Sequence, residues 1–166
     1  MTQQAGAAQN HSADDMVVVE QHINASPERV FQALTDAKQL TAWWGQEENC
    51  ENMSWEFEAR LGGRFRVRDR TKKPMEQLGG KQEFEAHGTI TVFDPPRTLE
   101  YTWFADWSDI PTQETRVRYE LTPKAGGTLV RVTHSGLTNQ PIARKDYSQG
   151  WVGVIRTLGQ YFERAA

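Results

Sequence analysis

The chain has 166 residues, of which 25% are charged and 37% are hydrophobic, and these proportions are typical of one globular domain. A formal net charge of −3 argues against a nucleic-acid-binding protein, which has to neutralise phosphates with lysine and arginine. The single cysteine, Cys50, excludes an internal disulfide and a zinc site built from several cysteines. Composition leaves open whether the protein is a monomer or a homodimer.

The first 15 residues lack the basic start and the apolar stretch of a secretion signal. We therefore predict a disordered N-terminal lead-in over residues 1–15 and one domain over residues 16–166. No stretch approaches the roughly 18 apolar residues of a membrane-spanning helix, so no membrane span is predicted. A reducing cytoplasm is the simplest setting for such a chain.

A β-branched stretch over residues 16–23 predicts the first strand. Ser26 and Pro27 then predict the start of a helix. A serine hydroxyl can accept a hydrogen bond from a free backbone amide, and a proline at the first helical position has no amide to leave unpaired.

Two adjacent tryptophans end a second short helix, which is predicted from Asp36 to Trp43 or Trp44 and stops at Gly45. Neighbouring side chains on a helix point about 100° apart, so one surface cannot easily hold both rings. We expect Trp43 to anchor the helix on the sheet together with Leu40. Trp44 is then expected to lie toward the rim of any cavity beneath the helix.

The middle of the chain alternates apolar and polar residues, as strands with one buried face do. We predict an antiparallel sheet from six such segments, at residues 53–60, 64–68, 83–92, 99–104, 114–121 and 129–134. Gly-Gly pairs at residues 62–63 and 126–127 are predicted to form hairpin turns rather than anion-binding loops.

One predicted strand has an arginine-rich outer face, formed by Arg64, Arg66, Arg68 and Arg70. Glutamates on the neighbouring strands could pair with these arginines: Glu56, Glu58, Glu83 and Glu85. A solvated, ion-paired face is the ordinary interpretation of this pattern, and a surface for an acidic partner is the alternative.

The last predicted element is a long helix that is capped by Thr138 or Asn139 and has Pro141 in its first turn. Its apolar stripe consists of Tyr147, Trp151, Val154, Leu158 and Tyr161 or Phe162. The stripe needs an apolar partner, and the sheet offers one. The order of elements predicts an α+β fold in which a curved sheet wraps around one helix.

Five segments carry a resemblance to a known family: ASPERVFQALTDAKQLTAWWG, FEARLGGRFRVR, HGTITVFDPPRTLEYTWF, ELTPKAGGTLVRVTHSGL and YSQGWVGVIRTLGQYF. In this order the chain resembles the START-like (SRPBCC, Bet v 1-like) superfamily. More narrowly, it resembles the family of activator of Hsp90 ATPase homologue 1-like proteins, as a single-domain, bacterial-type member. The family often has a proline where Gln46 stands. The resemblance implies a helix-grip fold and a cavity between the sheet and the C-terminal helix.

Small residues at inward positions are consistent with such a cavity. Ala86 and Gly88 lie in one predicted strand, and Gly150 and Gly153 flank the helix stripe. They either leave room for a guest or allow close packing, including a bend of the sheet at Gly88. The candidate ligand-binding residues are Trp44, Trp55, Phe65, Val67, Ala86, Gly88, Tyr101, Trp103, Tyr119, His134, Trp151 and Val154.

Catalytic and metal-binding motifs are lacking in the sequence. It contains no nucleophile elbow, no zinc-binding HExxH and no phosphate loop. Of the four histidines, only His134 is predicted to point inward, while His22 and His87 fall on wet faces and His11 lies in the lead-in. Cys50 has no identifiable activating base. No metal, cofactor or catalytic residue is therefore predicted, and a non-enzymatic role is favoured.

Three functions remain open at this level. The first is binding of a small apolar or amphipathic molecule in the cavity. The second, implied by the family resemblance alone, is an interaction with an Hsp90-type chaperone. The third is a cyclase- or hydrolase-like enzyme that uses the same cavity, with His134 as acid or base, Tyr101 or Tyr119 orienting the substrate, and Asp69 as a partner.

Overall fold

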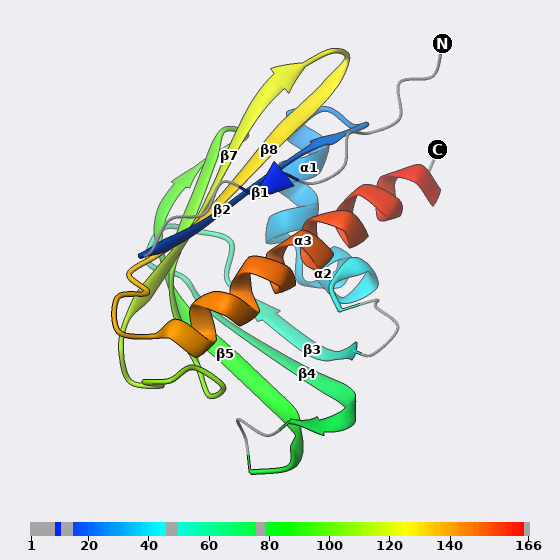
Figure 1. Ribbon diagram of the computed structural model, residues 1–166. Helices are drawn as coiled ribbons and strands as arrows, with labels where there is room; N and C mark the ends of the chain where they lie inside the picture. Colours follow the sequence, from blue (N-terminus) through cyan, green and yellow to red (C-terminus); the bar gives the residue numbers. More distant parts are fainter. Residues whose placement is uncertain (1–8, 11–14, 46–49, 76–78, 165–166) are drawn as a thin grey trace.

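The computed structural model describes residues 9–10, 15–45, 50–75 and 79–164, and shows an antiparallel sheet curled around one long helix (Figure 1). The strand order is β1-β2-β8-β7-β6-β5-β4-β3. Two short helices, α1 and α2, follow β2. The predicted α+β helix-grip fold is confirmed.

The strands are β1 (Gln9–Asn10), β2 (Met16–Ile23), β3 (Cys50–Phe57), β4 (Arg64–Met75), β5 (Lys81–Asp94), β6 (Thr98–Ala105), β7 (Thr115–Lys124) and β8 (Gly127–Ser135). Both predicted Gly-Gly turns join neighbouring antiparallel strands. The short strand β1 falls inside the predicted lead-in and pairs with β2. The rest of that lead-in before residue 15, including His11, lies outside the described residues, as does Gln46.

The two short helices begin as predicted. Helix α1 (Pro27–Thr35) is capped by Ser26, whose Oγ accepts a hydrogen bond from the backbone N–H of Arg29 at 3.3 Å. Helix α2 (Ala37–Trp43) is capped by Asp36 in the same way, through the backbone N–H of Lys38 at 3.2 Å. Serine and aspartate act here by satisfying amides that have no partner within the helix.

The cap of the long helix α3 (Pro141–Arg164) differs from the prediction. Asp109, from the loop between β6 and β7, accepts hydrogen bonds from the backbone N–H groups of Ile142 at 3.3 Å and Ala143 at 2.7 Å. The predicted cap at Thr138 or Asn139 is therefore wrong. A carboxylate that is remote in sequence satisfies the first turn, and its charge also suits the positive end of the helix dipole.

The outer face of β4 is ion-paired, as predicted. Arg70 lies 2.9 Å from Glu83, and Arg66 and Arg68 lie 3.7 and 3.4 Å from the two carboxylate oxygens of Glu85. These side chains are largely exposed, so each pair contributes about 0–1 kcal/mol. Among the described residues, three of the four arginines are thus paired within the sheet, and of the four predicted glutamates Glu83 and Glu85 take part, while Glu58 pairs with Arg60 instead.

Gly88 allows two strands to approach closely. A Cβ atom at this position would lie 1.8 Å from the carbonyl oxygen of Thr102 on β6. The register between β5 and β6 shifts just beyond, between Ile90 and Val92, and the backbone N–H of Thr89 donates to the Thr102 hydroxyl at 2.9 Å. Of the two roles open for Gly88, close packing at a sheet irregularity is the one that these contacts support.

Gly88→Ala should therefore destabilise the protein by about 1–3 kcal/mol or more, because the added methyl group forces backbone away from backbone. Gly150→Ala is the matched control: a Cβ there meets nothing within 4 Å. Removing a glycine from a helix interior should raise the stability by about 0.5–1 kcal/mol. Urea denaturation of both variants checks this pair, and similar midpoints for the two would contradict it.

Candidate functional site

A pocket of about 280 Å³ lies between α3, the end of α2, strands β3 to β6 and the loop after β6. Six aromatic side chains line it: Trp44, Phe84, Trp103, Trp107, Tyr147 and Trp151. The other lining residues are Gly45, Cys50, Asp69, Asp146, Gly150 and Val154. Among the described residues, the pocket is thus walled by aromatic rings and carries two carboxylates.

Helix α3 supplies one wall through residues that recur on one of its faces. Tyr147, Trp151 and Val154 are spaced i, i+4 and i+7, which places them side by side along the helix. Gly150 lies between them, and a Cβ built on it meets no atom within 4 Å. Gly150 is exposed as well as part of the lining, so the space next to it is open to solvent.

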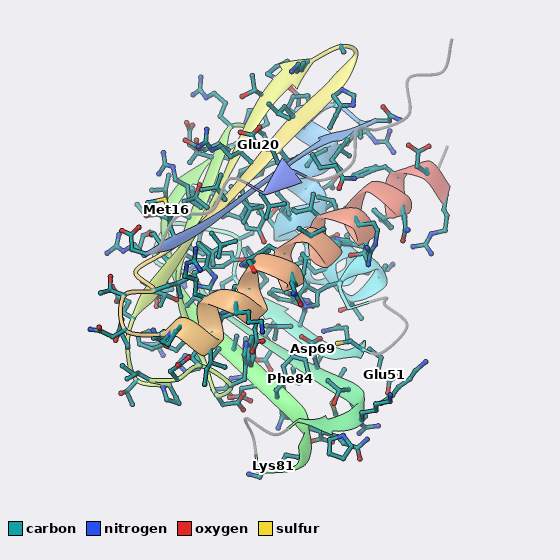
Figure 2. All side chains as sticks on the ribbon, viewed as in Figure 1. Met16, Glu20, Glu51, Asp69, Lys81 and Phe84 are labelled. Atoms are coloured by element: carbon teal, nitrogen blue, oxygen red, sulfur yellow. The ribbon has the colours of Figure 1, made fainter. Side chains whose placement is uncertain are left out.

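The sheet supplies the opposite wall. Asp69 on β4 and Phe84 on β5 are direct cross-strand partners on the side of the sheet that faces α3 (Figure 2). Asp69 is only 4% exposed. Its carboxylate accepts hydrogen bonds from Trp44 Nε1 at 3.2 Å and from Asn52 Nδ2 at 3.0 Å. These two donors satisfy carboxylate oxygens in a mostly apolar place.

The two neighbouring tryptophans have different surroundings. Trp43 is fully buried, and its Nε1 donates to the backbone carbonyl of Ala33 at 2.9 Å. Trp44 lines the pocket and meets the rings of Trp55 and Trp151 edge to face, with centroids 5.0 and 5.9 Å apart. Trp44 is only 5% exposed, so it belongs to the inner wall of the pocket rather than to an exposed rim.

Gly45 makes the sharp exit after this pair possible. Its φ of +69° lies in the left-handed region that favours glycine. A Cβ at this position would also lie 2.9 Å from the backbone nitrogen of Asn52 and 3.3 Å from Asp69 Oδ1. The predicted helix stop is confirmed, and the same glycine lets the chain pass close to the Asp69 carboxylate.

The loop between β6 and β7 closes one end of the pocket. Its Trp107 ring contacts Phe84 and Tyr147 edge to face, at centroid distances of 4.9 and 6.1 Å. The next residue, Ser108, shares a hydrogen bond of 2.9 Å with the Tyr147 hydroxyl, which also accepts one from Trp103 Nε1 at 3.0 Å. Burial raises the pKa of Tyr147 to about 12, so its hydroxyl is neutral at physiological pH. The loop is thereby held against α3.

His134 is buried beside this pocket, and both of its ring nitrogens are hydrogen-bonded. Trp151 Nε1 donates to Nδ1 at 3.0 Å, which leaves the ring proton on Nε2. Nε2 lies 2.8 Å from the hydroxyl of Thr115, and that hydroxyl donates to the carbonyl of Trp103 at 3.0 Å. Burial lowers the pKa of His134 to about 3. The imidazole thus links α3 to the sheet in its neutral form.

The neutral state of His134 predicts a pH dependence. The pKa of about 3 in the folded protein lies below the usual value of 6.5, so the folded state binds fewer protons than the unfolded state between these values. The stabilisation is complete above pH 6.5 and is lost as the pH falls toward 3, with a slope of at most about 1.4 kcal/mol per pH unit. Nitrogen-15 NMR of the ring should show neutral imidazole with the proton on Nε2 down to pH 4.5. A titration midpoint near 6.5 would refute this.

A second buried polar pair lies deeper in the core. The hydroxyls of Tyr101 and Tyr119 are 3.1 Å apart and hydrogen-bonded to each other. Burial raises the pKa of both tyrosines above their usual value, so both are neutral phenols. Neither belongs to the lining of the pocket.

Four of the twelve predicted binding residues line the pocket: Trp44, Trp103, Trp151 and Val154. Six others are buried in the adjoining core without lining it: Trp55, Val67, Ala86, Tyr101, Tyr119 and His134. Phe65 and Gly88 border a separate depression, whose other members are mostly polar or charged. Strand alternation predicts the buried face correctly, but it carries no information on how far along each strand the pocket lies.

Sequence reasoning left several lining residues out of the binding set. Phe84 and Tyr147 had the correct periodicity, so the signal was available. Trp107 lies in a connecting loop, where no periodicity operates. Asp146 and Gly150 follow from the helix face once Tyr147 and Trp151 are placed on it.

The remaining candidate groups lie outside the pocket or make other contacts. His22 shares a hydrogen bond of 2.7 Å with the carbonyl of Lys124, and His87 stacks on Phe104 on the exposed face. Cys50 is half-buried at the start of β3 and lines the pocket.

Within the described ranges, no three histidine, cysteine, aspartate or glutamate side chains are grouped as metal ligands. No described helix has the length and hydropathy to cross a membrane.

Comparison with known proteins gives a family match and a set of similar structures. The family model described as "Activator of Hsp90 ATPase homolog 1-like protein" matches residues 24–163, a range that includes all five segments quoted above. No curated protein matches the sequence.

Three solved structures illustrate the structural likeness. A protein from Rhodobacter sphaeroides is 21% identical, with a TM-score of 0.75 over 95% of this chain and 99% of its own. An AHSA1-like protein from Aeromonas hydrophila is 22% identical, with a TM-score of 0.69 over 90% and 93% of the two chains. A protein from Mesorhizobium loti is 24% identical, with a TM-score of 0.68 over 91% and 98%. At these identities the likeness shows a shared fold.

Proposed function

We propose that this chain, which belongs to the family of activator of Hsp90 ATPase homolog 1-like proteins, binds a small apolar or amphipathic molecule in the pocket beneath α3. The observation that carries the proposal is the concave, mostly aromatic lining of this pocket, to which α3 contributes Tyr147 and Trp151, with the exposed Gly150 beside them. Replacing a glycine inside a helix by alanine stabilises a protein by about 0.5–1 kcal/mol. The glycine at position 150 is therefore not the residue that stability alone would favour.

The composition of the pocket supports the same proposal. Small-molecule sites in proteins are concave and mostly apolar, with a few polar groups that orient the guest. Here six aromatic side chains form the walls, and Asp69 and Asp146 are the charged members of the described lining. The volume of about 280 Å³ lies just below the range of about 300–1,000 Å³ that is usual for such sites, so the guest is small.

A thermal-shift screen tests the binding function. Fatty acids, sterols, flavonoids and small aromatic amines would each be added to the purified protein at increasing concentration. A ligand that binds only the folded state stabilises it by about 2.7 kcal/mol at one hundred times its Kd, so a true ligand raises the Tm progressively. If no compound of any class changes the Tm, the proposal fails.

The chaperone-interacting role is an alternative that rests on the family description, and no contact of the described residues favours it. A cyclase- or hydrolase-like activity in the same pocket is the other alternative. Of the catalytic groups considered for it, Asp69 lines the pocket, whereas His134, Tyr101 and Tyr119 do not. Turnover of a bound compound would have to be observed before catalysis is assigned.

A further inference from the structure

The charge of the pocket lining is one-sided. Asp69 and Asp146 are its two ionisable acidic residues, and no lysine or arginine occurs among the described residues that line it. The buried His134 is not in the lining, and its lowered pKa keeps it neutral. A guest with a carboxylate or phosphate would therefore face negative charge and find no cationic side chain in this lining to pair with.

Asp69 lies where a carboxylate interacts strongly with a guest in the pocket. The residue is 4% exposed, and its carboxylate oxygens accept hydrogen bonds from Trp44 Nε1 and Asn52 Nδ2. Burying a carboxylate is costly unless nearby charges or hydrogen bonds compensate for the lost water. Solvent screens charges only weakly at such a site, so the ionised form of this carboxylate attracts a cationic guest in the pocket even without a direct hydrogen bond.

The aromatic walls favour the same sign of charge. The face of an indole or phenol ring is the negative end of its quadrupole and attracts cations. Four of the six tryptophans of the chain line this one pocket: Trp44, Trp103, Trp107 and Trp151. Phe84, the direct cross-strand partner of Asp69, places a further ring next to the carboxylate.

We infer that the guest is an organic cation, a protonated or quaternary amine joined to a small apolar body. The ammonium group contacts the aromatic wall within reach of Asp69 and Asp146, and the apolar body fills the rest of the pocket. This inference rests on the proposed binding function and names the class of its ligand.

Three probes of nearly the same shape test the charge preference. They are benzyltrimethylammonium, its neutral carbon isostere neopentylbenzene, and the anion 3-phenylpropanoate, each titrated against wild-type protein by tryptophan fluorescence. The cation should bind at least about tenfold more tightly than the anion, a ratio that one favourable charge contact is able to produce. Equal or tighter binding of the anion would overturn the inference, and this comparison needs no variant.

Asp69→Asn then isolates the carboxylate, with Asp146→Asn as a second variant on the half-buried face of α3. The ratio of the Kd of neopentylbenzene to that of the cation should fall about tenfold in Asp69→Asn, because the neutral probe does not respond to the lost charge. If neither variant changes that ratio, the inference is wrong. If only the neutral probe or only the anion binds, the inferred ligand class is wrong while the proposed binding function stands. If none of the three probes binds and the thermal-shift screen finds no ligand, the ligand class and the binding function are both wrong.

Discussion

Replacing Trp43 with alanine should lower the free energy of unfolding by about 3–5 kcal/mol. The side chain has no exposed surface, its ring meets that of Trp44 edge to face with centroids 5.6 Å apart, and its indole N–H donates to the carbonyl of Ala33. Alanine leaves a cavity the size of an indole and removes that hydrogen bond. Because α2 has only seven residues, it depends on this anchor for its place against α1.

Chemical denaturation measures the effect, and Trp107→Ala is the matched control. Trp107 is also a tryptophan packed against aromatic rings, but it lies in a loop and is only half-buried. Its loss should cost clearly less than that of Trp43. If Trp43→Ala costs no more than Trp107→Ala, Trp43 is not the anchor of α2.

Gly150→Leu should abolish ligand binding while leaving the fold intact. The leucine side chain would enter the space that is open at Gly150, between Tyr147 and Val154, and occupy the volume that we assign to the guest. Leucine also has a much better helix propensity than glycine, by about 0.8 kcal/mol, so the variant should not lose stability through the helix itself.

The matched control for this variant is Gln149→Leu. Residue 149 precedes Gly150 on α3, is exposed, and does not belong to the pocket lining. It tests the effect of an added leucine on α3 without filling the pocket. Isothermal titration with a compound from the thermal-shift screen should give wild-type affinity for Gln149→Leu and no measurable heat for Gly150→Leu. Wild-type affinity in both variants would place the guest elsewhere.

Local signals in the sequence predicted those parts of the fold that depend on local chemistry. The caps at Ser26 and Asp36 and the stop at Gly45 each act over a few residues, and all three are confirmed. Strand alternation predicted the buried faces, because the side-chain period of a strand is two. The family resemblance supplied the order in which the sheet and the long helix come together.

The features that sequence reasoning missed depend on contacts between distant segments. Asp109 caps α3 from a loop that precedes it by more than 30 residues, so no local pattern could replace Thr138 or Asn139 with it. Gly88 was compatible with two roles until its distance from the Thr102 backbone was known. The position of the pocket could not be predicted for the same reason, because Trp107 reaches the pocket from a loop.

The adjacent tryptophans illustrate what helical spacing could predict and what it could not. Helical spacing correctly separated Trp43, which packs on α1 through Ala33, from Trp44, which lines the pocket. It could not show that both rings are buried, or that Trp44 also donates to Asp69. Trp44 is therefore part of the packing that holds the pocket together, as well as a surface for the guest.

The six tryptophans provide the most direct test of the pocket, since each indole N–H gives its own NMR signal. Trp44, Trp103, Trp107 and Trp151 line the pocket, whereas Trp43 and Trp55 are buried outside its lining. A proton–nitrogen correlation spectrum would be recorded during titration with a compound from the thermal-shift screen. We predict that the first four indole signals shift in a saturable way and that the other two move much less. Saturable shifts confined to Trp43 and Trp55, or none at all, would contradict a binding site beneath α3.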